Sequence, residues 1–213
     1  MLESVALPQE KIIPAWLQPV VALDLLAARE LSLETVLTGT ALFVTDLPFT
    51  NHYLNAQQYE QLLVNGARLW PTNDFEFLLG HQIANDGLGP LHKVLMEPMP
   101  LGEWLSIITQ FDRLLTPNLN SRLYHSSNDD YFLLLSGSAS THCEPAVLKC
   151  AITLLTHLLK RFPDTLQVEA YFKNSAPEDI ELYHAHIPAN CHFSLPFNGL
   201  RIRSKQPCEK SPT

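Results

Sequence analysis

The sequence predicts an α+β fold in which an N-terminal helical part packs with a mostly antiparallel sheet. Helical periodicity, interrupted by turns rich in Pro and Gly, runs through the N-terminal half. The C-terminal half mixes alternating strand patterns with helices in the order α-ββ-α-β-α-ββ. With 213 residues, 46% hydrophobic and 17% charged, the chain is long enough to bury a sizeable core.

Several amphipathic helices are expected in the N-terminal half. The first begins after Pro14, and a short one follows with Ser32 as its N-cap and a stop at Gly39. Asn55 caps the next helix, and a polar cap also precedes the helix predicted over residues 72–83. The repeated pattern of a polar cap followed by an apolar stripe favours short helices joined by tight turns.

In the C-terminal half, strands and helices alternate. The expected elements are an amphipathic helix at 100–115, a β-hairpin from 118–127 and 131–138, a long helix at 144–161, a strand at 165–173, a short helix at 176–184, and a closing hairpin from 191–195 and 199–203. Pro145 falls in the first turn of the long helix, where a missing N–H is tolerated. We expect one domain over residues 1–203, with 1–13 as a loosely ordered lead-in and 204–213 as a linker or frayed tail.

Composition excludes several classes of function. The formal net charge is −8, and the only basic cluster, Arg201, Arg203 and Lys205, is short, so this chain is not expected to bind nucleic acid by itself. No basic leader or long apolar run predicts export or a membrane span, and four cysteines without a C-x-x-C pair indicate reduced thiols. We therefore expect a cytoplasmic protein without a cofactor.

The stretch "YHAHIPANCH" raises the question of a metal site. His184, His186, Cys191 and His192 could in principle supply zinc ligands. However, the cluster contains no acidic residue, and Cys191 and His192 point to opposite faces if they lie in a strand. The pattern favours exposed or hydrogen-bonded histidines over a metal site.

No convincing catalytic group emerges either. The stretch "GSASTHCE" places Ser138, Ser140, His142 and Cys143 close together, but it is not a G-x-S-x-G elbow. Nucleophile and base are rarely sequence neighbours, so capping of the helix near Glu144 is the favoured role for this stretch. The chain is not expected to be an enzyme.

The order of elements and several local motifs resemble the N-terminal, arabinose-binding-like sensor domain of AraC-family transcriptional regulators. The segments "LDLLAARELSLETVL", "DFEFLLG", "LGPL", "LGEWL" and "CHFSLPFNGLRI" carry this resemblance. The resemblance implies an effector-binding and dimerisation domain of a bacterial regulator. It also implies that DNA is read by a helix-turn-helix half that is absent from this chain. The alternative is a stand-alone α+β interaction or dimerisation module that takes no small molecule.

Four residues are candidates for an effector pocket between the helical half and the sheet: His92, Trp104, Tyr124 and Phe132. Aromatic and histidine side chains on otherwise apolar elements are typical of ligand cavities, although ordinary core packing is the competing interpretation for each. The identity of the effector does not follow from the sequence.

A homodimer is also expected, with the long helix as the candidate contact. Leu148, Ile152 and Leu155 lie about one turn apart along a stripe that is wider than a helix needs to cover a sheet. The surplus apolar surface either meets a second copy or is covered by the helical half. The residues alone do not separate the two, and the family resemblance favours the dimer.

Overall fold

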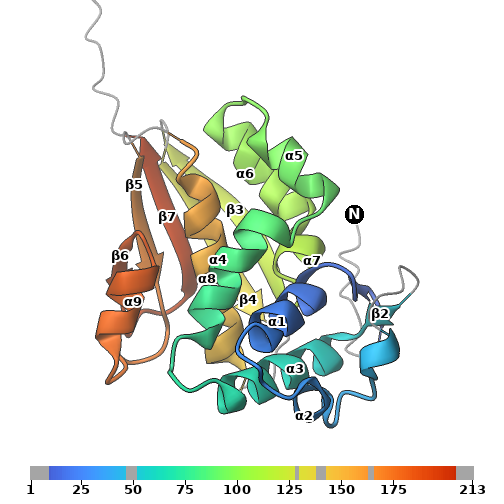
Figure 1. Cartoon of the computed structure of the whole chain (residues 1–213). Coiled ribbons are helices and arrows are strands. Elements are labelled where there is room, and N and C mark those ends of the chain that lie inside the picture. Colours follow the sequence, from blue (N-terminus) through green and yellow to red (C-terminus); the bar gives the residue numbers. More distant parts are fainter. Residues whose placement is uncertain (1–9, 47–51, 128–129, 138–142, 163–165, 205–213) are drawn as a thin grey trace, which may run out of the picture.

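The computed structural model describes residues 10–46, 52–127, 130–137, 143–162 and 166–204. A five-stranded sheet stands beside a helical half (Figure 1). The helices are α1 (Gln18–Ala27), α2 (Leu33–Leu37), α3 (Ala56–Leu69), α4 (Phe75–Asp86), α5 (Pro90–Met96), α6 (Leu101–Gln110), α7 (Asp112–Leu115), α8 (Glu144–Leu159) and α9 (Ile180–His186), with a 3-10 turn at Val44–Asp46. The strands are β1 (Ile13–Pro14), β2 (Tyr53–Leu54), β3 (Leu119–Ser127), β4 (Asp130–Gly137), β5 (Leu166–Tyr171), β6 (Asn190–His192) and β7 (Asn198–Ser204).

The predicted α+β class is confirmed, and the main sheet is mostly antiparallel. Its strand order is β3-β4-β7-β5-β6, and only the pairing of β5 with β6 is parallel. The closing hairpin predicted for 191–203 was wrong. β7 lies between β4 and β5, whereas β6 pairs with the other side of β5. The alternation of side chains specifies which face of a strand is buried but not which strand is its neighbour.

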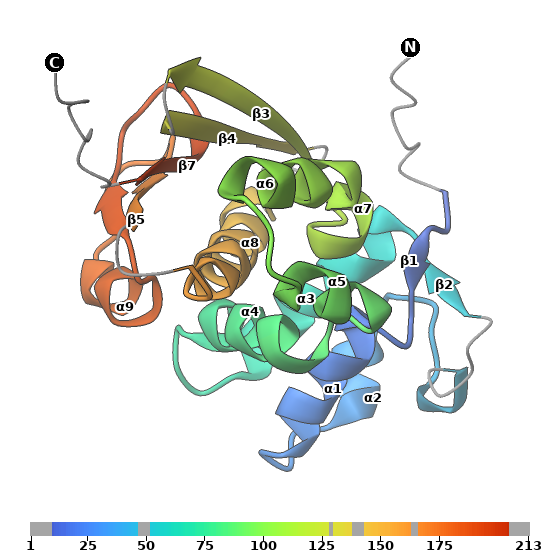
Figure 2. The ribbon, with the colours of Figure 1, turned by 90° about the horizontal axis from the view of Figure 1, so that it is seen from above.

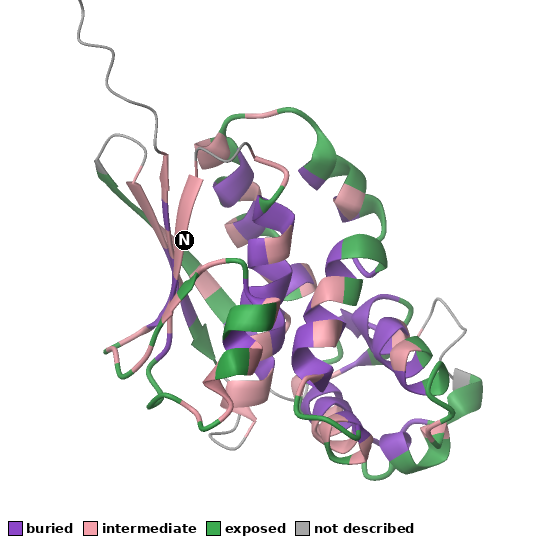
Figure 3. Ribbon diagram, turned by 60° about the vertical axis from the view of Figure 1, so that its left-hand side comes forward, coloured by how far each residue is buried: buried purple, intermediate pink, exposed green. Residues whose placement is uncertain are grey.

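Helix α8 lies between the sheet and α4 (Figure 2). The two helices approach closely at Gly80, where a Cβ atom would lie 2.5 Å from the backbone oxygen of Cys150 on α8. Buried residues run along this central part of the molecule (Figure 3). Trp104, Phe75 and Phe77 are among the largest fully buried side chains in the same core. The opposite face of the sheet carries no helix among the described residues.

Several predicted helix boundaries are confirmed. The Ser32 side chain accepts a hydrogen bond from the Thr35 backbone N–H, and Asn55 forms a capping box with Gln58. The helix predicted over 100–115 is broken at Phe111 into α6 and α7. The short helix α5 was not predicted. The small β1–β2 sheet was not predicted either, because two-residue strands leave no periodic pattern.

Among the described residues, we find no helix whose length and apolar character would let it cross a bilayer.

Candidate functional site

Two of the four predicted pocket residues lie in the helical half. Trp104 is fully buried, its indole N–H donates to the Leu95 carbonyl oxygen at 3.1 Å, and its ring meets Phe162 edge-on at a centroid distance of 5.4 Å. His92, on α5, is half-buried, and its Nδ1 atom has no hydrogen-bond partner among the described residues. The contacts of Trp104 are those of a core residue that satisfies its one polar atom.

The other two predicted residues, Tyr124 and Phe132, lie on the outer face of the sheet. They are directly opposite each other on β3 and β4, whereas the adjacent Leu133 is buried on the face toward the helices. Tyr124 is 50% exposed, and the Arg201 guanidinium lies 4.9 Å from the centroid of the Phe132 ring. The structure therefore does not bring the four residues around one space, and their contact with an effector stays a prediction.

The three residues predicted for the dimer contact, Leu148, Ile152 and Leu155, are all buried inside this chain. None of them is more than 2% exposed, because the sheet covers one side of α8 and α4 covers another. The flanking elements therefore cover the wide apolar stripe, and these side chains offer no surface to a second copy. Any dimer of this domain has to use other residues.

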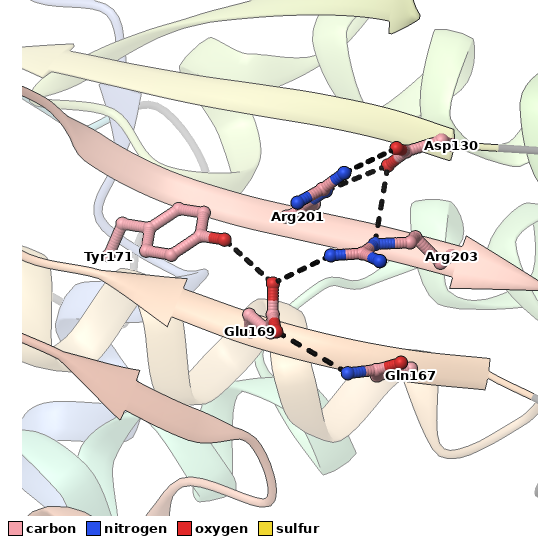
Figure 4. Close-up of polar contacts among 6 residues, drawn as sticks. All are labelled: Asp130, Gln167, Glu169, Tyr171, Arg201 and Arg203. Atoms are coloured by element: carbon pink, nitrogen blue, oxygen red, sulfur yellow. Dashed lines mark hydrogen bonds and ion pairs between the residues drawn. The ribbon is translucent and has the colours of Figure 1, made fainter. Parts of the chain in front are cut away.

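A polar network spans the outer face of the sheet (Figure 4). Arg201 on β7 donates two hydrogen bonds to the Asp130 carboxylate on β4, at 3.0 and 2.7 Å. Two positions further along β7, Arg203 lies 3.4 Å from Glu169 on β5. Glu169 also accepts a hydrogen bond from the Tyr171 hydroxyl at 2.7 Å. The network thus ties together the three central strands of the sheet.

The electrostatics of this network indicate a structural role. The hydrogen bonds from Arg201 hold the pKa of Asp130 below its usual value. Burial, and then its hydrogen bond to Glu169, raise the pKa of Tyr171. Two guanidinium groups, on Arg201 and Arg203, are matched by two carboxylates. The network therefore presents no surplus charge to a ligand.

Sequence reasoning missed a histidine cluster at the junction of α4, α8 and α9. The Nδ1 atoms of His81 and His157 are 3.0 Å apart. His186 stacks on Phe77 at a centroid distance of 5.1 Å, and its Nε2 atom lies 3.9 Å from an Asp74 carboxylate oxygen. These residues come from distant segments, so nothing in the local sequence indicates that they meet.

Both rings of the His81–His157 pair favour the neutral form. Burial, followed by the effect of His157, lowers the pKa of His81 to about 4, and burial and the nearby Lys160 lower the pKa of His157. Two neutral imidazoles at this distance share one hydrogen bond, with one Nδ1 as donor and the other as acceptor. The pair therefore links α4 to α8 at neutral pH.

The residues considered for a metal site do not converge on one point. His184 is exposed on α9, and His192 is exposed on β6, where its ring leans against Tyr171. Cys191 is half-buried, and burial raises the pKa of its thiol to about 11. In the described part of the chain, no three His, Cys, Asp or Glu side chains converge in a way that could hold a metal ion. Of the stretch considered for catalysis, residues 138–142 lie outside the described residues.

Among the described residues, two cavities, one of about 570 Å³ and one of about 460 Å³, fall within the size range of small-molecule sites, which is about 300–1,000 Å³. The first is lined by residues 34–45, which form one continuous stretch of chain. The second lies between the end of α8, the start of β5 and Pro188 after α9. Because three separate elements form the second cavity, its shape is set by tertiary packing.

Comparison with solved structures gives the same fold in two groups of proteins. The transcriptional regulator CdpR from Pseudomonas aeruginosa superposes with a TM-score of 0.63 at 11% identity, over 88% of this chain and 55% of that chain. A doubly substituted H-NOX protein gives a TM-score of 0.56 at 10% identity, over 92% of this chain and 95% of the other. A further H-NOX structure, from work on haem distortion, gives a TM-score of 0.55 at 11% identity, over 92% of this chain and 97% of the other. This chain therefore spans about half of CdpR.

Two comparisons bear on the class of protein. The structure shares its fold with a transcriptional regulator. The family model for the N-terminal arabinose-binding domain of AraC transcription regulators matches residues 31–206, and the chain belongs to this family. The resemblance seen in the sequence motifs is thereby confirmed. No curated protein matched the sequence.

Proposed function

We propose that this chain is the effector-binding domain of an AraC-type transcriptional regulator, and that it senses a small molecule without catalysing a reaction. The observation that carries the proposal is the family match over residues 31–206. Two cavities of ligand size in the described structure support it. The buried cysteine Cys150, whose thiol pKa is raised by burial, is no candidate nucleophile.

A thermal-shift screen against sugars, amino acids, fatty acids and other small metabolites tests effector binding. A ligand that binds only the folded state raises the midpoint by mass action, and a ligand at 100 times its Kd adds about 2.7 kcal/mol. We expect one chemical class to give a saturable shift. If no class shifts the midpoint, the alternative of an interaction module without a small-molecule ligand is favoured instead.

We also propose that the domain forms a homodimer and that DNA is reached only through a separate helix-turn-helix half. Paired half-sites on DNA favour a two-fold protein, and the net charge of −8 disfavours phosphate contacts by this chain. Sedimentation at micromolar concentration tests the dimer, and a monomer with and without effector contradicts it. A gel shift at low salt with DNA from upstream of its own gene tests the second point. Tight, sequence-dependent binding by residues 1–213 refutes it.

A further inference from the structure

The wall of the cavity at the end of α8 is part apolar and part polar. Five of its lining residues are apolar: Leu159, Phe162, Leu166, Val168 and Pro188. In a sixth, Thr156, the hydroxyl donates to the backbone oxygens of Ile152 and Thr153, at 2.7 and 3.1 Å, and is therefore already hydrogen-bonded within α8. The apolar part of the wall offers contacts suited to a hydrocarbon chain or ring, and the polar part leaves room for a head group.

The cavity lies at a corner where, within the described ranges, the sheet is incomplete. β6 pairs with β5 only from Glu169 to Tyr171, whereas β7 pairs with β5 along its full length from Leu166. Beside Leu166 and Val168, no described strand continues the sheet on the β6 side. Pro188, which has no N–H to donate, lies there instead. The space left open is bounded by the last turn of α8.

One charged side chain borders this space. Lys160 is the C-cap residue of α8, is exposed, and lines the cavity. Within the described ranges, no carboxylate lies within ion-pairing distance of its ammonium group. The next residue, Arg161, is engaged elsewhere, because it donates to the backbone oxygens of Met96 and Glu97. Lys160 thus supplies a positive charge at the rim of this cavity.

We propose that this cavity binds a small apolar carboxylate, with its hydrocarbon part against Leu159, Phe162 and Val168 and its carboxylate on Lys160. The inference rests on the proposed function, since it assigns the effector site and the chemical class of the effector. Burial of the hydrocarbon part supplies the driving force, and the lysine selects the sign of the head group. Among its described lining residues, which fall between Glu34 and Thr45, the first cavity has no Lys or Arg and includes Glu34, so this part of its wall does not suit an anion.

Decanoate is the probe, and decanol and decylamine are matched probes that differ only in the head group. Titration calorimetry and thermal shift are run on the full chain below the concentration at which the probes form micelles. We expect saturable binding of decanoate, weaker binding of decanol and the weakest binding of decylamine. The inference fails if decanoate does not bind, or if decylamine binds equally well.

Variants separate the site from non-specific binding. Lys160→Gln should weaken decanoate binding by about tenfold and leave decanol unchanged, because only the charge contact is lost. Lys93→Gln, on the exposed face of α5, removes the same charge elsewhere and should change neither. Val168→Phe fills the cavity and should abolish binding of both probes. If Val168→Phe does not fold, Lys160→Glu replaces it as the test, because the position is exposed. The new negative charge should abolish decanoate binding.

The outcomes distinguish this inference from the proposed function. If decanoate binds equally to Lys160→Gln and to the unchanged chain, the assigned site is wrong. If a compound of another class stabilises the domain and Val168→Phe does not alter its binding, the site is wrong while effector sensing stands. If no compound of any class binds, both fail.

Discussion

Replacing Gly80 with Ala tests the central helix contact of the fold. A Cβ atom at this position would lie 2.5 Å from the Cys150 backbone oxygen, 2.9 Å from Thr153 Cβ and 3.1 Å from the Leu154 backbone nitrogen. Two of these atoms belong to the α8 backbone, which cannot rotate away as a flexible side chain can. Overpacking of this kind costs about 1–3 kcal/mol, and the upper end applies when backbone must move. The better helix propensity of Ala returns about 1 kcal/mol.

The net expectation is a loss of about 2 kcal/mol in the free energy of unfolding, because the larger steric cost outweighs the propensity gain. For a domain of this size that corresponds to a fall in Tm of roughly 4–8 °C. Urea unfolding followed by circular dichroism measures the change in the free energy of unfolding. Asn85→Ala, on the exposed side of α4, is the control and should change stability by less than about 0.5 kcal/mol. A Gly80→Ala protein as stable as the unchanged chain refutes the close contact between α4 and α8.

Three further predictions concern other contacts. Asn55→Ala removes the capping box of α3 and should cost about 1 kcal/mol in urea unfolding, whereas Ala at the neighbouring exposed Gln57 should cost little. Asp130→Asn removes the charge that pairs with Arg201 and should lower stability by about 1 kcal/mol, since the pair is partly exposed; an unchanged unfolding midpoint contradicts a role for the network. The native state keeps His81 neutral down to a pKa of about 4, so stability should fall as pH drops from about 6.5 towards 4. In His81→Gln, the loss of Tm between pH 7 and pH 5 should be smaller, and an equal loss in both proteins contradicts this assignment.

Local signals made much of the fold predictable. The caps at Ser32 and Asn55 follow from side chains that hydrogen-bond to the first turn, and this chemistry is complete within a few residues. The Leu-Gly pair at the end of the "DFEFLLG" motif also acquires a physical meaning. Leu79 is fully buried, and Gly80 permits the approach of α8. Such features need only one segment and its immediate partner.

Features that depend on distant segments were not predictable. The insertion of β7 between β4 and β5 brings Arg201 to Asp130 and Arg203 to Glu169, and it therefore creates the network on the outer face. The histidine cluster likewise needs α9 to pack beside α4. Tyr124 and Phe132 were assigned to an interior pocket because aromatic residues in a hairpin suit either face. Only the register with the buried Leu133 places them outside.

Helix α8 shows why a wide apolar stripe does not by itself indicate a dimer. A helix that covers a sheet alone needs one apolar face, but α8 is covered by the sheet on one side and by α4 on another, and so it is apolar on most of its circumference. Two of its polar side chains are also engaged within this chain. Lys149 pairs with Glu76 at 3.5 Å, and His157 contacts His81. The last turn of α8 is buried as well, since Leu158 and Leu159 are at most 4% exposed. Exposure begins at the C-cap residue Lys160, which borders the open cavity.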